Sequence, residues 1–299
     1  MRLFYHWYYK FTVLLLVALA TTCLWAGDLS SQQGLLWQIS KPNSTPSYLF
    51  GTIHSEDKRV NQLPAIVNSL FEQADSASFE LLMDIPTMLK SASAMLFTEK
   101  QQSLEQLINK DLYNKVIKSL NQYSIPVNVA KKLKPWAVTV MLSTPPSKAG
   151  EFLDILLYRK AQQLKIPTYG LEKVEEQLQV FEDLPLEDQV ILLQETLSRF
   201  EQMPNIFAKM HELYLQRNLT ALMQFSNEYM QPSYSRHEKL IKSVYKKLVD
   251  DRNLKMVKRM QKRLQEGNAF IAVSALHLPG EKGIIKLLQK QGYQVSALY

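Results

Sequence analysis

Two short segments, one near each end of the 299-residue chain, place a histidine just after an apolar run. Residues 47–54 read SYLFGTIH and residues 269–277 read AFIAVSALH. Histidine binds metals and serves as a general base near neutral pH, and the end of a buried strand is where open α/β sheets build their sites. The alternative is a buried histidine bonded to the backbone. Because the same pattern occurs twice, we interpret His54 and His277 as active-site residues.

Two glutamates have comparable positions. Glu80 stands within the apolar sequence Phe79–Leu82, where an unpaired charge is costly to bury and therefore needs a cation, a metal or a proton. Glu172 closes another apolar segment. The alternatives are a solvent-facing residue of an edge strand for Glu80, and a first-turn helix residue favoured by the helix dipole for Glu172.

Together, His54, Glu80, Glu172 and His277 could hold one divalent metal with positions open for water. Such an ion lowers the pKa of bound water and polarises a carbonyl, and a carboxylate outside the coordination sphere could act as general base. This is hydrolytic chemistry. An oxygen-rich ligand set suits manganese or cobalt as well as zinc, so the ion is not specified.

The remaining polar residues give weaker indications of function. Arg252 and Asn253 either cap a helix at the surface or bind a carboxylate or oxyanion of a substrate. His211 lacks the second histidine of a zincin helix, and we expect His211 and His237 to be surface residues. The basic residues within 236–263 recur along helices and are expected to form a solvated face.

The elements that must position these residues alternate between strands and helices. We expect strands at 35–39, 48–53, 77–82, 166–172, 269–275 and 293–298, with the first two forming a hairpin. Amphipathic patterns predict a helix with Ile66, Val67, Leu70 and Phe71 on one face, and helices at 150–163 and 283–290. The predicted fold is α/β, a central mixed β-sheet flanked by helices. One domain over 27–299 would contain a largely helical insertion at roughly 86–165 and 178–266.

Residues 1–26 have the features of a secretory signal peptide: basic residues, an apolar run over 11–19 and a cleavage site after Ala26. An uncleaved membrane anchor is the alternative. The one cysteine, Cys23, lies in this segment, so the mature chain would have no disulfide and no thiolate metal ligand. We expect a periplasmic or secreted bacterial protein without stable membrane insertion after cleavage.

The net charge gives little indication of a polyanionic partner. It is +7 for the whole chain, and 7 − 2 = +5 once Arg2 and Lys10 are removed. This mild excess argues against nucleic-acid binding. The hydrophobic content of 46% is enough for an ample core.

A set of short motifs stands in order along the chain. These are FGTIH at 50–54, FEL at 79–81, KPW at 134–136, GLEKVEEQ at 170–177, RN at 252–253 and AVSALHLPGEKG at 272–283. The set resembles the TraB/PrgY/GumN family, whose animal relatives are the Tiki proteins and which is related to erythromycin esterase-like and haem-binding ChaN-like proteins. The similarity spans nearly the whole mature chain.

The resemblance implies a metal-dependent hydrolase site. His54 and His277 match the histidines of the family's two Gly-x-x-His motifs, Glu80 and Glu172 match its acidic positions, and Arg252 matches the arginine before the last strand. Tiki proteins are metalloproteases that trim the amino terminus of Wnt proteins, which implies a peptide or protein substrate here.

One position departs from the family pattern. Ser274 stands where the second motif usually has glycine. If that glycine is needed for a positive φ or a close backbone approach, serine would impair the pocket.

Three functional hypotheses follow. The leading one is an exported metal-dependent hydrolase, a peptidase of the Tiki type. The alternative is a non-catalytic periplasmic protein that sequesters a peptide or haem, since PrgY-like members resemble pheromone inhibitors. A third is a structural accessory of a surface polysaccharide system, suggested by the GumN name.

Overall fold

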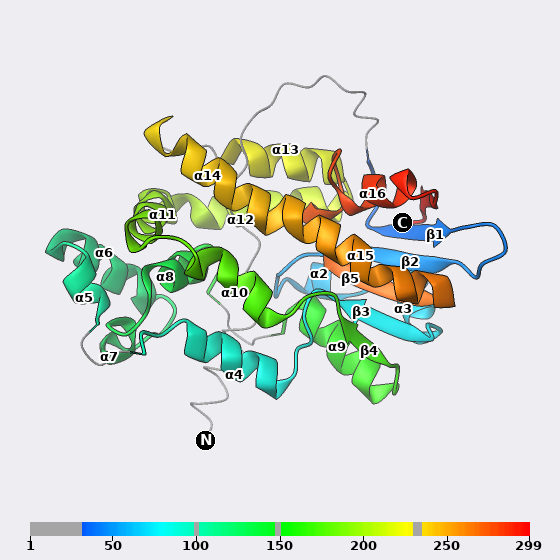
Figure 1. The fold of residues 1–299 in the computed structure, drawn as a ribbon, viewed down its shortest axis with the longest axis horizontal. Helices are drawn as coiled ribbons and strands as arrows, with labels where there is room; N and C mark the ends of the chain where they lie inside the picture. Colours follow the sequence, from blue (N-terminus) through cyan, green and yellow to red (C-terminus); the bar gives the residue numbers. More distant parts are fainter. Residues whose placement is uncertain (1–31, 99–101, 147–150, 230–234) are drawn as a thin grey trace.

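The computed structural model describes residues 32–98, 102–146, 151–229 and 235–299. The predicted signal segment, with Cys23 and Ala26, lies outside these residues. The described chain forms a six-stranded sheet in the order β4-β3-β5-β2-β1-β6 (Figure 1). The strands are β1 (Leu36–Ser40), β2 (Ser47–Thr52), β3 (Ser76–Phe79), β4 (Thr168–Gly170), β5 (Ala269–Ser274) and β6 (Gln294–Ala297).

The sheet is mixed. The strands β4, β3, β5 and β2 run parallel to one another, whereas β1 pairs antiparallel with both β2 and β6. The hairpin of β1 and β2 is confirmed, with Asn43 at φ 61° in the connecting turn. Strand β5 lies between β3 and β2, and Thr52 of β2 pairs with Ser274 at its end. The three segments that precede His54, Glu80 and His277 are therefore neighbours in space.

Every residue of β5 and of β3 is buried. Since successive side chains of a strand point to opposite faces, both faces of the sheet must be covered, as is usual for parallel strands. In Figure 1, α15 (Asp251–Glu266) crosses in front of the strands, and its apolar residues share one core with them. Helix α9 (Leu153–Gln163) contributes to that same core. The α/β fold with a mixed central sheet is confirmed.

The remaining helices before the last strand complete the described fold. They are α2 (Lys58–Asn61), α3 (Ala65–Glu72), α4 (Ile85–Ala94), α5 (Leu104–Leu107), α6 (Lys110–Asn121), α7 (Val127–Ala130), α8 (Pro135–Leu142), α10 (Val174–Glu182), α11 (Leu186–Ser198), α12 (Met203–Leu215), α13 (Leu219–Tyr229), α14 (Glu238–Tyr245) and α16 (Ile284–Lys290).

A second hydrophobic core lies within the helical part of the chain. It gathers apolar side chains of α6, α8, α11 and α14 around Trp136, which is fully buried and stacks on Phe181 of α10. In Figure 1, helices α5 to α8 lie on the opposite side of the molecule from β1 and β2. The helical part thus has its own apolar interior, and the sheet carries the other core.

Several local predictions need correction. Strand β3 ends at Phe79, so Glu80 follows the strand instead of lying within it, and β4 covers only Thr168–Gly170. Ile66 is 40% exposed, because α3 buries Val67 and Phe71, one helical turn apart.

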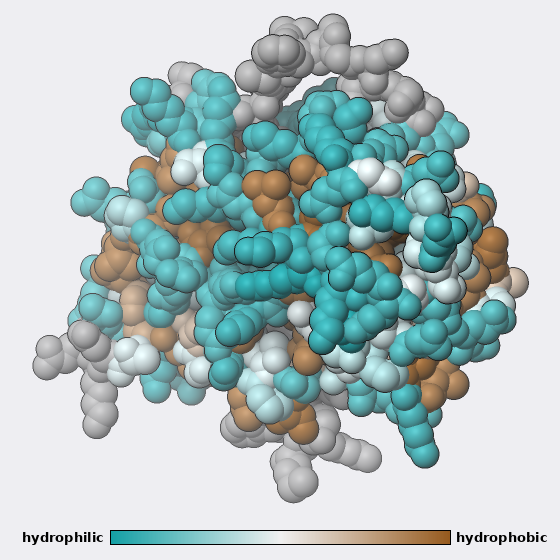
Figure 2. All heavy atoms as spheres, turned by 45° about the vertical axis from the view of Figure 1, so that its right-hand side comes forward, coloured by the Kyte–Doolittle hydropathy of each residue, from teal (hydrophilic) through white to brown (hydrophobic). Residues whose placement is uncertain are grey.

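The solvated basic face holds for Lys255, Lys258 and Lys262 of α15, whereas Arg252 and Arg263 are buried. The face of the molecule in Figure 2 is mostly hydrophilic, with apolar side chains in separate small areas. Among the described residues, no helix combines the length and apolar character needed to cross a membrane.

Candidate active site

The carboxyl ends of the four parallel strands meet at one edge of the sheet, and each is followed by one of the predicted residues. Glu80 comes directly after β3, His54 and Glu172 come two residues after β2 and β4, and His277 ends the 3₁₀ turn η4 (Ala275–His277) after β5. The edge outside the carboxyl ends of parallel strands is the usual site in open α/β folds. The topology therefore brings the four residues to the same place.

Glu80 is at the centre of this group. Its Oε1 accepts a hydrogen bond from the N–H of Ser274 at 2.7 Å, and its Oε2 accepts one from Nη2 of Arg252 at 2.6 Å. Burial opposes ionisation of Glu80, but the His277 imidazole, the Arg252 guanidinium, the N–H of Ser274 and the His54 imidazole together lower its pKa to about 2. Glu80 is thus a carboxylate at neutral pH.

His277 is fully buried and held by an amide. Its Nδ1 lies 2.6 Å from Oδ1 of Asn253, and Nδ2 of Asn253 donates to the carbonyl of Lys282 at 2.8 Å. An amide oxygen only accepts, so Nδ1 carries the proton and Nε2 has a free lone pair. Burial, opposed by Glu80 but aided by Arg252, lowers the pKa of His277 to about 3, and the imidazole is neutral.

Nε2 of His277 is a buried nitrogen without a hydrogen-bond partner among the described residues. It lies 3.7 Å from Oε1 of Glu80, too far for a hydrogen bond. A buried polar atom left in this way is a cost that native proteins usually avoid. This lone pair is therefore available to an electrophile or to a proton donor from outside the protein.

Arg252 joins the two glutamates. Its Nε and Nη2 contact both carboxylate oxygens of Glu172 at 2.6–3.0 Å, while Nη2 also reaches Glu80. Glu172 accepts a further bond from Gln177 at 2.9 Å, and its side chain is 1% exposed. Burial disfavours the guanidinium, but the two carboxylates outweigh it and raise the pKa of Arg252. The carboxylate of Glu172 is directed at Arg252 and not at His277.

The helical segment just before Arg252 departs from α-helical geometry and provides a hydrogen-bond acceptor for its side chain. Residues Lys246–Asp250 form a π-helical turn, η3, between α14 and α15. The carbonyl of Leu248 accepts a hydrogen bond from Nη1 of Arg252 at 3.1 Å. Single π turns inside helices are frequent at functional sites. Here the turn supplies a carbonyl that fixes the third nitrogen of the guanidinium.

Asp154, which the sequence reasoning missed, stands beside His54. Its Oδ2 lies 2.9 Å from Nδ1 of His54, although the two atoms lack the alignment of a hydrogen bond. Its Oδ1 accepts a hydrogen bond from the Thr52 hydroxyl at 2.6 Å. Burial lowers the pKa of His54, but Asp154 and, more weakly, Glu80 outweigh it, and the net shift is upward. The sequence did contain a signal for this residue. Asp154 stands three residues before Leu157 and seven before Ala161, which places a carboxylate on the buried face of its helix.

The departure at Ser274 has no structural cost. Its φ is −57° and its ψ 139°, an extended conformation open to any residue, and its bond to Glu80 comes from the backbone. Gly51, the matching residue of the first motif, differs. A Cβ there would lie 3.2 Å from Cα and Cβ of Ala275 and from a methyl of Leu278. Close approach therefore disfavours a side chain at Gly51, whereas the backbone at Ser274 accepts one.

His211 and His237 are both less exposed than the surface positions predicted for them. His237 is buried, with Nδ1 2.7 Å from Oε1 of Glu195. His211 is half-buried on α12 and lines a pocket together with His54. Both corrections have the same reason: tertiary packing covers positions that helical spacing alone assigns to solvent.

In the described part of the chain, no three His, Cys, Asp or Glu side chains form a ready metal cluster. The chemistry of the donors nonetheless fits a divalent ion. Two ligands that each lie about 2.1 Å from one ion are roughly 3–4 Å apart. His277 Nε2 and Glu80 Oε1 are separated by 3.7 Å, and both are unprotonated at neutral pH. The charge of Glu80 contributes to the raised pKa of His54, so the two side chains lie near each other. His54 is therefore a third candidate donor.

The fold and the site define an α/β protein whose parallel strands end at a buried cluster of imidazoles, carboxylates and one guanidinium. The chain belongs to the TraB/PrgY/gumN family, whose model matches residues 35–297. This confirms the resemblance seen in the sequence motifs.

Curated relatives carry names that state an activity. The chain is 23% identical to Metalloprotease TIKI2 of Danio rerio, over 87% of this chain and 60% of that protein. It is 25% identical to Metalloprotease TIKI1 of Danio rerio and 24% identical to that of Xenopus tropicalis, over 90% and 89% of this chain and 63% and 62% of those proteins. The chain thus spans less than two thirds of the length of these relatives. No solved structure matches it.

Proposed function

We propose that this protein hydrolyses peptide bonds with a divalent metal held by His54, Glu80 and His277. The observation that carries the proposal is the free lone pair of His277 Nε2, buried and 3.7 Å from Oε1 of an ionised glutamate. The names of the Tiki relatives, which state metalloprotease activity, support it. Manganese, cobalt and zinc all remain candidates for the ion.

When bound, the metal supplies Lewis acidity and a water of lowered pKa. Neighbouring side chains of the protein orient the two histidine donors. Asn253 holds the proton of His277 on Nδ1 and leaves Nε2 free, and Asp154 faces Nδ1 of His54 in the same sense. Partners of this kind behind ligating histidines set the tautomer and the ring orientation.

Arg252 and Asn253 act as positioning residues in this proposal, not as substrate-binding residues, since both are almost fully buried. Arg252 holds Glu80 ionised and in place, and Glu172 holds Arg252. In this proposal Glu172, which was predicted to be a metal ligand, instead holds Arg252 in place.

We also propose that the substrate is a peptide or protein, that the protein is exported through residues 1–26, and that 27–299 form one domain. The export rests on the signal-like sequence, and the substrate class on the names of the relatives.

Metal titration followed by a peptide assay tests the function. Purified protein is stripped with chelator, titrated with Mn²⁺, Co²⁺ and Zn²⁺, and assayed on a peptide library by mass spectrometry. We expect one ion per chain and metal-dependent cleavage, both lost in E80Q and H277A. The control E175Q changes an exposed glutamate that pairs with Lys90, and it should keep both.

The variant H54A separates two roles of His54. If His54 is a ligand, metal affinity falls together with activity. If it is a general base, the ion still binds and activity alone is lost. Cleavage by E80Q at the rate of the unchanged protein would end the proposal, whereas tight peptide binding without turnover, indifferent to E80Q, would support the sequestering alternative.

A further inference from the structure

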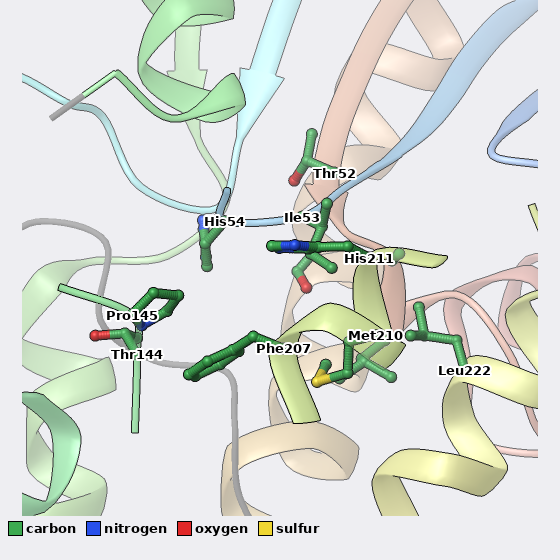
Figure 3. Close-up of a pocket in the computed structure, with 12 residues that line it drawn as sticks. Thr52, Ile53, His54, Thr144, Pro145, Phe207, Met210, His211 and Leu222 are labelled. Atoms are coloured by element: carbon green, nitrogen blue, oxygen red, sulfur yellow. The ribbon is translucent and has the colours of Figure 1, made fainter. Parts of the chain in front are cut away.

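A pocket opens directly beside the candidate metal donors. His54, together with Thr52 and Ser274 at the ends of β2 and β5, forms the wall that the pocket shares with the active site. The opposite wall comes from α12 and α13, and Thr144 and Pro145 close a third side. Figure 3 shows His54, Pro145, Phe207 and His211 facing a common space.

Apart from this shared wall, the lining is predominantly apolar. Phe207 and Met210 of α12 and Leu222 of α13 face it, with Ile53 and Leu276 beside the two motif histidines. None of the lining residues is a lysine, arginine, aspartate or glutamate. Mostly apolar walls with few convergent polar groups are typical of ligand pockets.

His211 adds no charge to this lining near neutral pH. Burial lowers its pKa, and the neighbouring Asp57 opposes this only in part. Apart from His54, a charged group entering the pocket would therefore find no counter-ion in its walls and would lose its hydration. An apolar side chain would instead be transferred from water to an apolar surface, which is favourable.

We propose that this pocket binds an apolar side chain of the peptide substrate, in the residue adjoining the bond that is cleaved. The inference rests on the proposed function and adds its substrate class: peptides with an uncharged, bulky residue such as leucine, phenylalanine or methionine at that position. His54 places the pocket beside the reacting bond, and the flexible thioether of Met210 lets the wall adapt to different apolar shapes.

The test uses the metal-loaded full chain and the peptides acetyl-Ala-Ala-X-Ala-Ala-amide, with X as Gly, Leu, Phe, Trp, Lys or Glu. We expect cleavage next to X and a kcat/KM for Leu or Phe that exceeds that for Gly, Lys or Glu by about tenfold or more. Dissociation constants of the same peptides are measured in parallel in E80Q, where cleavage cannot obscure binding.

Two substitutions at one residue should move specificity in opposite directions. M210W fills the pocket and should lower the Phe-to-Gly ratio of kcat/KM about tenfold, whereas M210A enlarges it and should raise the Trp-to-Leu ratio. Met95→Ala makes the same truncation in the helical core and should leave both ratios unchanged. Melting temperatures separate a loss of fold from a change of preference.

The outcomes distinguish the two proposals. Metal-dependent cleavage that is indifferent to X, or ratios that M95A moves as much as M210A, overturns the pocket assignment and leaves the hydrolase standing. If no peptide is cleaved, the proposed hydrolase function is wrong, and the dissociation constants then test the pocket alone. Tighter binding of peptides with an apolar X, lost in M210W, supports the pocket. Equal dissociation constants for all X reject it.

Discussion

Asp154 and His54, a hundred residues apart in the chain, lie 2.9 Å from each other, carboxylate oxygen to Nδ1, at the edge of the sheet. Asp154 comes from the first turn of α9 and is itself held by the hydroxyl of Thr52, the last residue of β2. A helix far from the histidine motif thereby sets the protonation and orientation of its imidazole.

D154N should move the acid limb of the pH–activity profile to lower pH. The neighbouring carboxylate raises the pKa of His54, and the neutral amide removes that effect, so His54 stays unprotonated in more acidic solution. Activity at the optimum should fall by about 10–100-fold, because the imidazole loses its orienting partner. A profile measured from pH 4 to 9 checks this, and an unmoved acid limb would contradict it.

R252M should lower the free energy of unfolding by about 3–5 kcal/mol, because it leaves Glu80 and Glu172 as buried carboxylates without their cation. R252K should recover little, since an ammonium cannot reproduce the bidentate bonds of a guanidinium. Urea denaturation measures both. The matched control is R259M on the same helix, whose pair with Glu176 is partly exposed and worth about 1 kcal/mol or less.

The two motif positions should respond differently to exchange. G51S should destabilise the protein by about 1–3 kcal/mol, since its Cβ would enter a packed contact with Ala275 and Leu278. S274G should leave both stability and activity close to those of the unchanged protein, because the bond to Glu80 is made by the backbone. Thermal melting and peptide assays on the two variants test the asymmetry, and equal effects would argue against it.

Metal-free protein should lose stability as the pH falls below about 6.5. The pKa of His277 is about 3 in the folded protein, whereas an ordinary histidine has a pKa of 6.5, so between these values the unfolded chain binds a proton that the folded protein does not. This contributes up to about 1.4 kcal/mol per pH unit. Urea denaturation of the chelated protein between pH 7 and 5 should show a steeper decline than H277Q. Parallel curves for the two proteins would show that His277 is not held neutral.

The sequence alone predicted the two strands that precede the histidines, although it placed the ends of β3 and β4 too late. Apolar runs closed by Gly51 and Ser274, with a histidine three positions on, placed His54 and His277 at one sheet edge, because the carboxyl ends of parallel strands meet there. The confirmed α/β class and family membership rest on the same local patterns. Such patterns are readable because a short continuous apolar run is typical of a strand that is buried on both faces.

The partners of those residues were decided by tertiary structure alone. Asp154 behind His54, Asn253 behind His277, and the pairing of Glu172 with Arg252 each join positions between 24 and 100 residues apart. No local periodicity encodes such contacts, because they depend on how α9 and α15 pack against the sheet. The pocket between β2, β5, α12 and α13 arises in the same way, from side chains that the sequence shows only as apolar stripes of helices and strands.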